Sequence, residues 1–294
     1  MSVAICEGAK GFLVGRLQRA LGSLKVDNDF GPATARRVRE YQLEHGMAET
    51  GDADPGAWHS LGLMFPTPFE RCLMLTGAYE GTGFGGINRK DIDGAGVTLG
   101  IVGFTTQHGE VQRLITKYLT DRKGALAIVP SPQREKLLTF MQQGASAEAW
   151  ERLFYGSDGI ADAWVVNAIR TWGNDEVFQR IQMEMTEGSF WVPACKTARD
   201  LNITSMAGLG LLFDTYVQNG GWKDKHKRVY AEQSHDGTER ARLMAMVKAI
   251  AAGANPKWQN DVYLRKVTFV SGGGKVHGSY YDLTDYGFEK VSDL

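Results

Sequence analysis

Cysteine is scarce in this sequence, with Cys6, Cys72 and Cys195 far apart among 294 residues. An odd number of widely spaced cysteines argues against a disulfide framework. We therefore expect each to be a small buried apolar residue rather than a nucleophile. The six histidines lack the close spacing of metal ligands, and no serine lies in a nucleophile-elbow motif. Neither a metal ion nor an organic cofactor is expected.

Net charge and long apolar runs are also missing. The formal net charge is −1 and no five like charges follow one another, so nothing favours nucleic acid or an anionic membrane. No stretch reaches the roughly 18 apolar residues of a membrane span, so stable membrane insertion is not expected. The opening MSVAICEGAKGFLVGRLQRALG lacks the three regions of a signal peptide. We expect synthesis in a reducing cytoplasm without a leader.

The first part of the sequence has the pattern of a small helical module. Val14, Leu17 and Leu21 fall at helical spacing, and VDNDF is turn chemistry. GPAT then opens a second helix with Pro32 at a tolerated early position. TGDADPGAW is a further turn that leads into a third short helix around Trp58. The pattern predicts a three-helix bundle, and a generic bundle would show the same periodicity.

Four pieces of this module carry a family resemblance: LQRALGSL, VDNDFGPAT, RRVREYQ and TGDADPGAWHSLG. Together they resemble the peptidoglycan-binding type 1 module. Asp27-Asn28 stands where that family usually has Asp-Gly, and asparagine also tolerates a left-handed backbone. The resemblance implies bacterial peptidoglycan as the partner, with Phe30, Tyr41 and Gln42 as wall-binding residues.

FPTPF, residues 65–69, reads as a stiff connector because two prolines lie so close together. We therefore expect one domain over residues 1–66 and a second over residues 67–294. The predicted fold class is mainly α (α+β), with a small three-helix bundle and a larger domain that contains a β-hairpin region. RKVTFVSGGGKVHGSYYDL, near the end of the chain, reads as a late hairpin with no assigned role.

A single glutamate follows the connector helix at a suggestive place. Phe69, Cys72, Leu73 and Thr76 recur at i, i+3, i+4 and i+7, and Glu80 lies on the same face. A carboxyl at the end of a core-facing stripe is partly desolvated, which raises its pKa. A glutamic acid of this kind can protonate a glycosidic oxygen. Glu80 could equally be a solvated residue at a helix end.

The segment after Glu80, GTGFGGINRKDIDGAGVTLGIVGF, is rich in glycine and holds two acids. Glycine keeps bulky side chains out of a cleft, and Gly100 lies where a sugar could approach the backbone. Asp93 and Thr98 could together hold a water molecule. A protonated acid opposite an ionised base is the minimal apparatus for glycoside hydrolysis. Asp91 and Asp93 could also be simple turn formers.

DIDGAGVTLGIVGF is similar to the signature of the family-46 chitosanases, a branch of the lysozyme-like superfamily. Asp93, Gly96, Thr98 and Gly103 match, and Glu110 stands where a later acid is usually Asp. The resemblance implies a lysozyme-like fold with Glu80 as general acid, Asp93 as general base, and Thr98 as the residue that orients the attacking water. Asp91, Gly100 and Glu110 are then assigned to substrate binding.

Three departures from the family pattern put chitosan specificity in question. Ala95 replaces the expected arginine, and Gly81 replaces the polar residue that usually follows the glutamate. The gap from Glu80 to Asp93 is thirteen positions, shorter than is usual in the family. Asp91 is the alternative base if the loop register differs by two. Because the smaller phage-type lysozymes share a similar Glu, Asp, Thr order, the muramidase interpretation is natural.

We therefore expect an endolysin-like muramidase that cuts between N-acetylmuramic acid and N-acetylglucosamine. It would be a monomer that acts on the cell wall after release from the host cytoplasm into the periplasm, as a bacteriophage lysis enzyme does. A secreted antibacterial effector is also compatible with the sequence. A chitosanase and a wall-binding protein with a dead catalytic site are the alternatives. A lytic transglycosylase, which needs a glutamate and no base, is a lesser variant.

Overall fold

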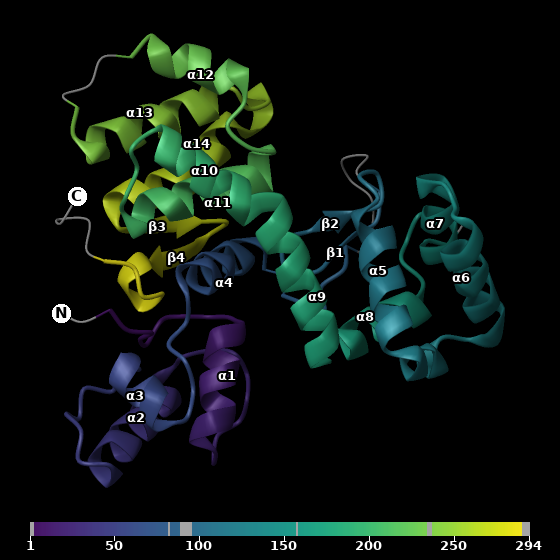
Figure 1. Cartoon of the computed structure of the whole chain (residues 1–294), viewed down its shortest axis with the longest axis horizontal. Coiled ribbons are helices and arrows are strands. Elements are labelled where there is room, and N and C mark those ends of the chain that lie inside the picture. Colours follow the sequence, from purple (N-terminus) through teal and green to yellow (C-terminus); the bar gives the residue numbers. More distant parts are fainter. Residues whose placement is uncertain (1–2, 82, 89–95, 157, 234–236, 290–294) are drawn as a thin grey trace. The chain divides into compact units, whose positions relative to one another are not determined.

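The computed structural model describes residues 3–81, 83–88, 96–156, 158–233 and 237–289 (Figure 1). Contacts divide the chain into two compact units, one formed by Met1–Tyr79 with Gly188–Leu294 and the other by Glu80–Glu187. The described residues form fourteen α-helices and two short antiparallel hairpins. The chain is thus mainly helical, as predicted. Among these residues no helix is both long and apolar enough to cross a membrane.

The first unit begins with the small helical module. It has the three expected helices, α1 (Phe12–Leu21), α2 (Pro32–Glu44) and α3 (Pro55–Ser60). Asn28 adopts a φ of 62°, so the predicted left-handed turn is present. Trp58 is fully buried, and the Asp54 side chain caps α3 by accepting a hydrogen bond from the Ala57 amide.

The rest of the first unit is built around α11 (Met206–Asn219). Most residues of this helix are buried, which is typical of a helix in the centre of a fold. It packs against α10, α13 and α14. The other elements are α4 (Pro68–Glu80, up to Tyr79), α10 (Val192–Asp200), α12 (Asp224–Ala231), α13 (Glu239–Ala252), α14 (Gln259–Ser271), β3 (Gly273–Val276) and β4 (Ser279–Asp282). The late hairpin expected from the sequence is therefore β3–β4.

The described residues of the second unit form a small hairpin, five α-helices and a short 3-10 helix, Lys123–Ile128. Its strands β1 (Thr98–Leu99) and β2 (Phe104–Thr105) are antiparallel, with Thr98 opposite Thr105. The buried rings of Tyr118 and Phe178, with centroids 4.8 Å apart, join α5 to α9. The helices are α5 (Glu110–Asp121), α6 (Ser131–Gln143), α7 (Ala147–Phe154), α8 (Ala163–Trp172) and α9 (Glu176–Thr186).

Within the first unit, the small module is joined to the C-terminal segment by main-chain contacts. Ile5 forms bridges to both Ala53 and Tyr286, and the Cys6 amide donates to the Asp285 carbonyl. The module is therefore attached by more than the FPTPF connector, and the predicted domain boundary near Pro66 stays a prediction. Cysteine burial is mixed, because Cys72 is buried while Cys6 and Cys195 are half-buried; all three are free thiols.

Acidic side chains meet where the module joins the C-terminal segment. Burial, together with the nearby charges of Asp282, Asp52 and Glu7, raises the pKa of Asp285 to about 7. The Gly8 backbone lies against this carboxyl, so a side chain at position 8 would collide with it. The junction consequently favours a neutral carboxyl at Asp285.

This junction predicts a specific pH dependence of stability. Between the usual pKa of 3.8 and about 7, the unfolded chain loses the Asp285 proton while the folded chain keeps it. The free energy of unfolding should therefore fall as pH rises through this window, and the deficit should persist above it. Because asparagine resembles the neutral acid, Asp285→Asn should match the parent at pH 4 and be more stable at pH 8. Urea unfolding of the parent and the variant at both pH values tests this prediction. If the free energies of unfolding of the two proteins differ by the same amount at pH 4 and pH 8, the prediction is wrong.

Candidate active site

Glu80 occupies the place that the sequence predicts for it. The stripe of Phe69, Cys72, Leu73 and Thr76 is buried on α4, and Glu80, the last residue of the helix, is half-buried. The helix ends here because the following Gly81 adopts a φ of 71°, a usual way to terminate an α-helix. A half-buried carboxyl at a helix end can reach a substrate, and its role as general acid stays a prediction.

Thr98 is fixed in its hairpin by Asn88, a residue that the sequence analysis missed. The Thr98 amide donates to Asn88 Oδ1 at 2.7 Å, and the Asn88 amide donates to the Thr98 carbonyl at 2.9 Å. Asn88 Nδ2 also donates to the Gly96 carbonyl, and the Tyr155 hydroxyl donates to Asn88 Oδ1 at 2.9 Å. Both contacts with Thr98 use its main chain, so they leave the choice of its side chain open.

Gly100 is buried beside a second polar residue that the sequence analysis missed, Gln182. The Gln182 amide group is fully buried and spans two backbone groups, the Ile101 N–H at 3.0 Å and the Phe84 carbonyl at 2.9 Å. Gly100 has a φ of 84°, and a side chain at this position would collide with Gln182. Packing therefore already requires glycine here, and sugar contact by Gly100 stays a prediction.

Glu110 supports the same hairpin from the start of α5. Its carboxylate accepts hydrogen bonds from the Thr105 amide at 3.0 Å and the Thr105 hydroxyl at 3.4 Å. A carboxylate in the first turn is also favoured by the helix dipole. The structure thus gathers Thr98, Gly100 and Glu110 around one hairpin, where Glu110 has a structural partner. Its contact with substrate stays a prediction.

Asp91 and Asp93 lie outside the described residues, so the pairing of Glu80 with a base stays a prediction. The three predicted wall-binding residues are described and need a correction. The side chains of Phe30, Tyr41 and Gln42 are 0%, 9% and 1% exposed, because they form the interior of the module. Gln42, for example, binds the Gly51 amide and the Asp52 carbonyl. In this structure they shape the module, and a polymer would have to contact other residues.

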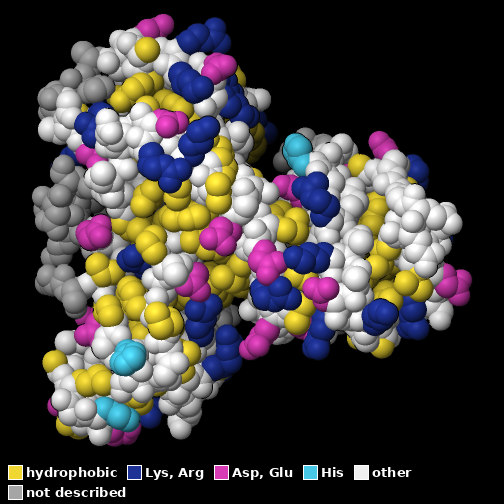
Figure 2. Space-filling model, viewed as in Figure 1, with side chains coloured by type: hydrophobic (Ala, Val, Ile, Leu, Met, Phe, Trp, Pro, Cys, Tyr) yellow, Lys and Arg dark blue, Asp and Glu magenta, His cyan; other side chains and the backbone are white. Residues whose placement is uncertain are grey.

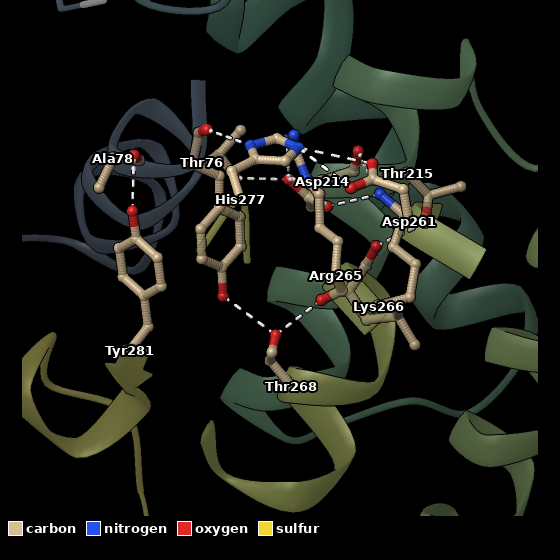
Figure 3. A network of polar contacts seen from close by, with 12 residues as sticks. Thr76, Ala78, Asp214, Thr215, Asp261, Arg265, Lys266, Thr268, His277 and Tyr281 are labelled. Atoms are coloured by element: carbon tan, nitrogen blue, oxygen red, sulfur yellow. Dashed lines mark hydrogen bonds and ion pairs between the residues drawn. The ribbon is translucent and has the colours of Figure 1, made fainter. Parts of the chain in front are cut away.

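A buried charged cluster lies next to α4 in the first unit (Figure 3). We call Asp214, Arg265 and Lys266 the Asp214 cluster; each side chain is at most 1% exposed. Arg265 Nη2 lies 2.6 Å from Asp214 Oδ1, and Lys266 Nζ donates to the Asp214 carbonyl at 3.0 Å. Thr76 of α4 donates to Asp214 at 3.2 Å. The cluster therefore ties α4, α11 and α14 together.

The charges within the cluster outweigh the effect of burial. Burial alone would raise the pKa of Asp214, but the two cations hold it below its usual range.

Across the described residues, no group of three or more His, Cys, Asp or Glu side chains could hold a metal ion.

Comparison with known proteins gives two family matches. Residues 81–247 match the family described as glycosyl hydrolase family 46, and residues 12–61 match the putative peptidoglycan binding domain. The first match begins directly after Glu80 and ends in α13, before α14 and the β3–β4 hairpin. A chitosanase of Bacillus subtilis strain 168 is 27% identical over 158 residues, which are 52% of this chain and 52% of that protein. The chain thus spans about half the length of this curated relative.

Solved structures show the same fold. A mutant chitosanase of Bacillus subtilis MY002, complexed with 6 GlcN, has a TM-score of 0.54 at 19% identity. That alignment covers 72% of this chain and 96% of the other. A family-46 chitosanase of Gynuella sunshinyii, in complex with chitotetraose, has a TM-score of 0.53 at 17% identity and covers 75% and 99%. The helical chitosanase fold is therefore shared, which agrees with the predicted lysozyme-like class.

The Asp214 cluster predicts a large effect of one substitution on stability. Asp214→Asn leaves the buried charges of Arg265 and Lys266 without their shared carboxylate, and breaking such a group costs about 3–5 kcal/mol. Asp224→Asn is the matched control, because Asp224 is exposed and pairs only at the surface with Lys227; a surface pair contributes about 0–1 kcal/mol. Chemical denaturation measures both, and equal losses would contradict the proposed importance of the cluster.

Proposed function

Because this chain belongs to glycosyl hydrolase family 46, we propose that it hydrolyses β-1,4 bonds in a glucosamine-containing polymer of the chitosan type. The match over residues 81–247 carries this proposal. It is supported by the name of the Bacillus subtilis relative and by the sugars bound in the solved relatives. These comparisons favour the chitosanase alternative over the muramidase reading that the sequence analysis preferred.

In this proposal the reaction is a single displacement by water. Glu80 protonates the glycosidic oxygen as the bond to the leaving sugar breaks. Asp93 removes a proton from a water molecule that Thr98 orients, and this water attacks the anomeric carbon from the opposite face. The anomeric configuration is therefore inverted. The half-buried position of Glu80 at the end of α4 and the fixed backbone of Thr98 support these roles.

Charge gives modest support for a cationic polymer. Residues 80–187 contain 14 acidic and 11 basic side chains, so this part of the chain has a negative excess that attracts a polyamine. On the face shown in Figure 2, acidic and basic side chains are interspersed over the surface of this unit.

The match of residues 12–61 favours a second candidate, an endolysin-like muramidase directed to peptidoglycan. It would act on the cell wall after release from the cytoplasm in which it is made. Three polymers separate the candidates: soluble chitosan, intact sacculi, and sacculi whose glucosamine has been N-deacetylated. Cleavage of chitosan or only of deacetylated sacculi supports the first proposal. Cleavage of fully acetylated sacculi with reducing muramic acid ends supports the second, and anhydro ends would instead indicate a transglycosylase.

The carboxyl roles predict a graded mutational series. Glu80→Gln should lower the rate by at least about 10²-fold, the lower range for a positioned general acid. Asp93→Asn should be comparably damaging, whereas Asp91→Asn should be mild. Circular dichroism checks folding, and NMR of the first product reports the inverted anomer. A folded Glu80→Gln enzyme with parental turnover would show that the catalytic assignment is wrong, and a severe Asp91→Asn would move the base to Asp91.

Thr98→Val tests the water-orienting role. The main-chain bonds between Thr98 and Asn88 survive this change, and valine suits a strand, so the fold should persist. Loss of the hydroxyl should reduce kcat by roughly tenfold or more if the water loses its position. Thr105→Val is the control in the same hairpin, because the Thr105 hydroxyl bonds His108 and Glu110. Similar kcat values for both variants would rule out a special role for Thr98.

A further inference from the structure

The last turn of α4 has an unusual arrangement of hydrogen bonds. The final four carbonyls of an α-helix have no partner within the helix. Here two of them are bound by side chains of β3–β4, which we call the C-terminal hairpin (Gly273–Asp282). The Tyr281 hydroxyl donates to the Ala78 carbonyl at 3.0 Å, and His277 Nδ1 lies 3.0 Å from the Tyr79 carbonyl (Figure 3). These partners are 203 and 198 positions apart in the sequence.

His277 adopts a left-handed backbone conformation, which glycine and asparagine adopt more readily than histidine. It has a φ of 48° and the next residue, Gly278, a φ of 85°, between the paired ends Val276 and Ser279. A two-residue turn with both φ values positive favours Asn-Gly. Histidine tolerates this conformation less well than glycine, and such a cost often accompanies a function. The contact of its imidazole with the Tyr79 carbonyl gives a reason for histidine at this position.

Tyr79, the residue directly before Glu80, is held on every side. Its hydroxyl lies 3.0 Å from the Thr268 hydroxyl, and its ring stacks edge-on against Tyr281 with centroids 4.8 Å apart. The Arg265 guanidinium lies 5.2 Å from the ring centroid. The ring, hydroxyl and carbonyl of Tyr79 thus all contact α14 or the C-terminal hairpin, and these contacts hold the last turn of α4 in place.

We propose that the C-terminal hairpin positions the candidate general acid, with His277 and Tyr281 as positioning residues that act through the last turn of α4. This inference rests on the proposed function, because it concerns the helix that ends at Glu80. A general acid works only when held close to its productive geometry, so a loose final turn lowers kcat. The hairpin lies beyond residues 81–247, outside the family match.

Two turn-compatible substitutions of His277 separate positioning from folding. Glycine and asparagine both suit a left-handed turn, but only asparagine keeps a donor, at the place of Nδ1. His277→Gly should lower kcat roughly 10- to 100-fold with KM unchanged. His277→Asn should retain most of the parental kcat, and Tyr281→Phe should lose kcat while keeping its ring packing. The substrate is soluble chitosan, or sacculi if the parent cleaves only those, and thermal unfolding is measured in parallel.

Each outcome decides the proposal. A lower kcat in His277→Gly, with rescue by His277→Asn and a parental unfolding temperature, supports it. A parental kcat in His277→Gly overturns the proposal. An equal loss of kcat in His277→Gly and His277→Asn also overturns it, as does a loss of kcat that only parallels a lower unfolding temperature. Glu80→Gln is assayed alongside. If Glu80→Gln is fully active, the proposed function has failed, whereas an inactive Glu80→Gln with an active His277→Gly means that only the positioning inference has failed.

Discussion

Asp214 places a negative charge inside the first unit, where an unpaired ion would be strongly destabilising. Arg265 and Lys266 are consecutive residues of α14, so both cations reach Asp214 only if α14 keeps one rotation and register against α11. Thr76 adds the same constraint on α4 through its bond to Asp214. An apolar contact would tolerate small shifts between these helices. A buried carboxylate that three helices share does not tolerate such shifts. The position of α4, which ends at Glu80, therefore depends on Asp214.

In the second unit, two neutral amide side chains bind the backbone around the β1–β2 hairpin. Residues 83–88 and 96–105 contain little regular structure, so few helix or sheet hydrogen bonds are available to their backbone. Asn88 and Gln182 supply missing partners: the Asn88 side chain binds main-chain groups of Gly96 and Thr98, and the Gln182 side chain binds those of Phe84 and Ile101. A buried backbone group without a partner costs about 1–3 kcal/mol, so single amide side chains have a large influence on this hairpin. The main chain of Thr98 is held by Asn88.

The elements that the sequence predicted are those set by local patterns. The stripe from Phe69 to Thr76, the left-handed Asn28 and the late hairpin follow from spacing and turn chemistry alone. Gln182 was missed because its partner Ile101 lies about 80 positions away in the sequence, and Asp214 because its partner Arg265 lies about 50 positions away. The available signal for both was a polar residue on an otherwise apolar helix face. Phe30, Tyr41 and Gln42 were assigned outward roles although their spacing suits a core. The polymer could not be predicted, because an acid, a base and a threonine serve either substrate.

The module and the last turn of α4 also share a physical link within the first unit. Tyr286 forms a bridge with Ile5 of the module, its hydroxyl accepts from the Lys10 amide, and its ring lies 6.2 Å from that of Tyr281. Tyr281 in turn binds the last turn of α4. Removal of the module would therefore uncover Tyr286 and disturb its contact with the C-terminal hairpin, besides removing the wall binding proposed for the module. A loss of activity in such a truncated chain would combine two effects. Substitutions on the exposed surface of the module separate them, because they leave Ile5 and Lys10 in place.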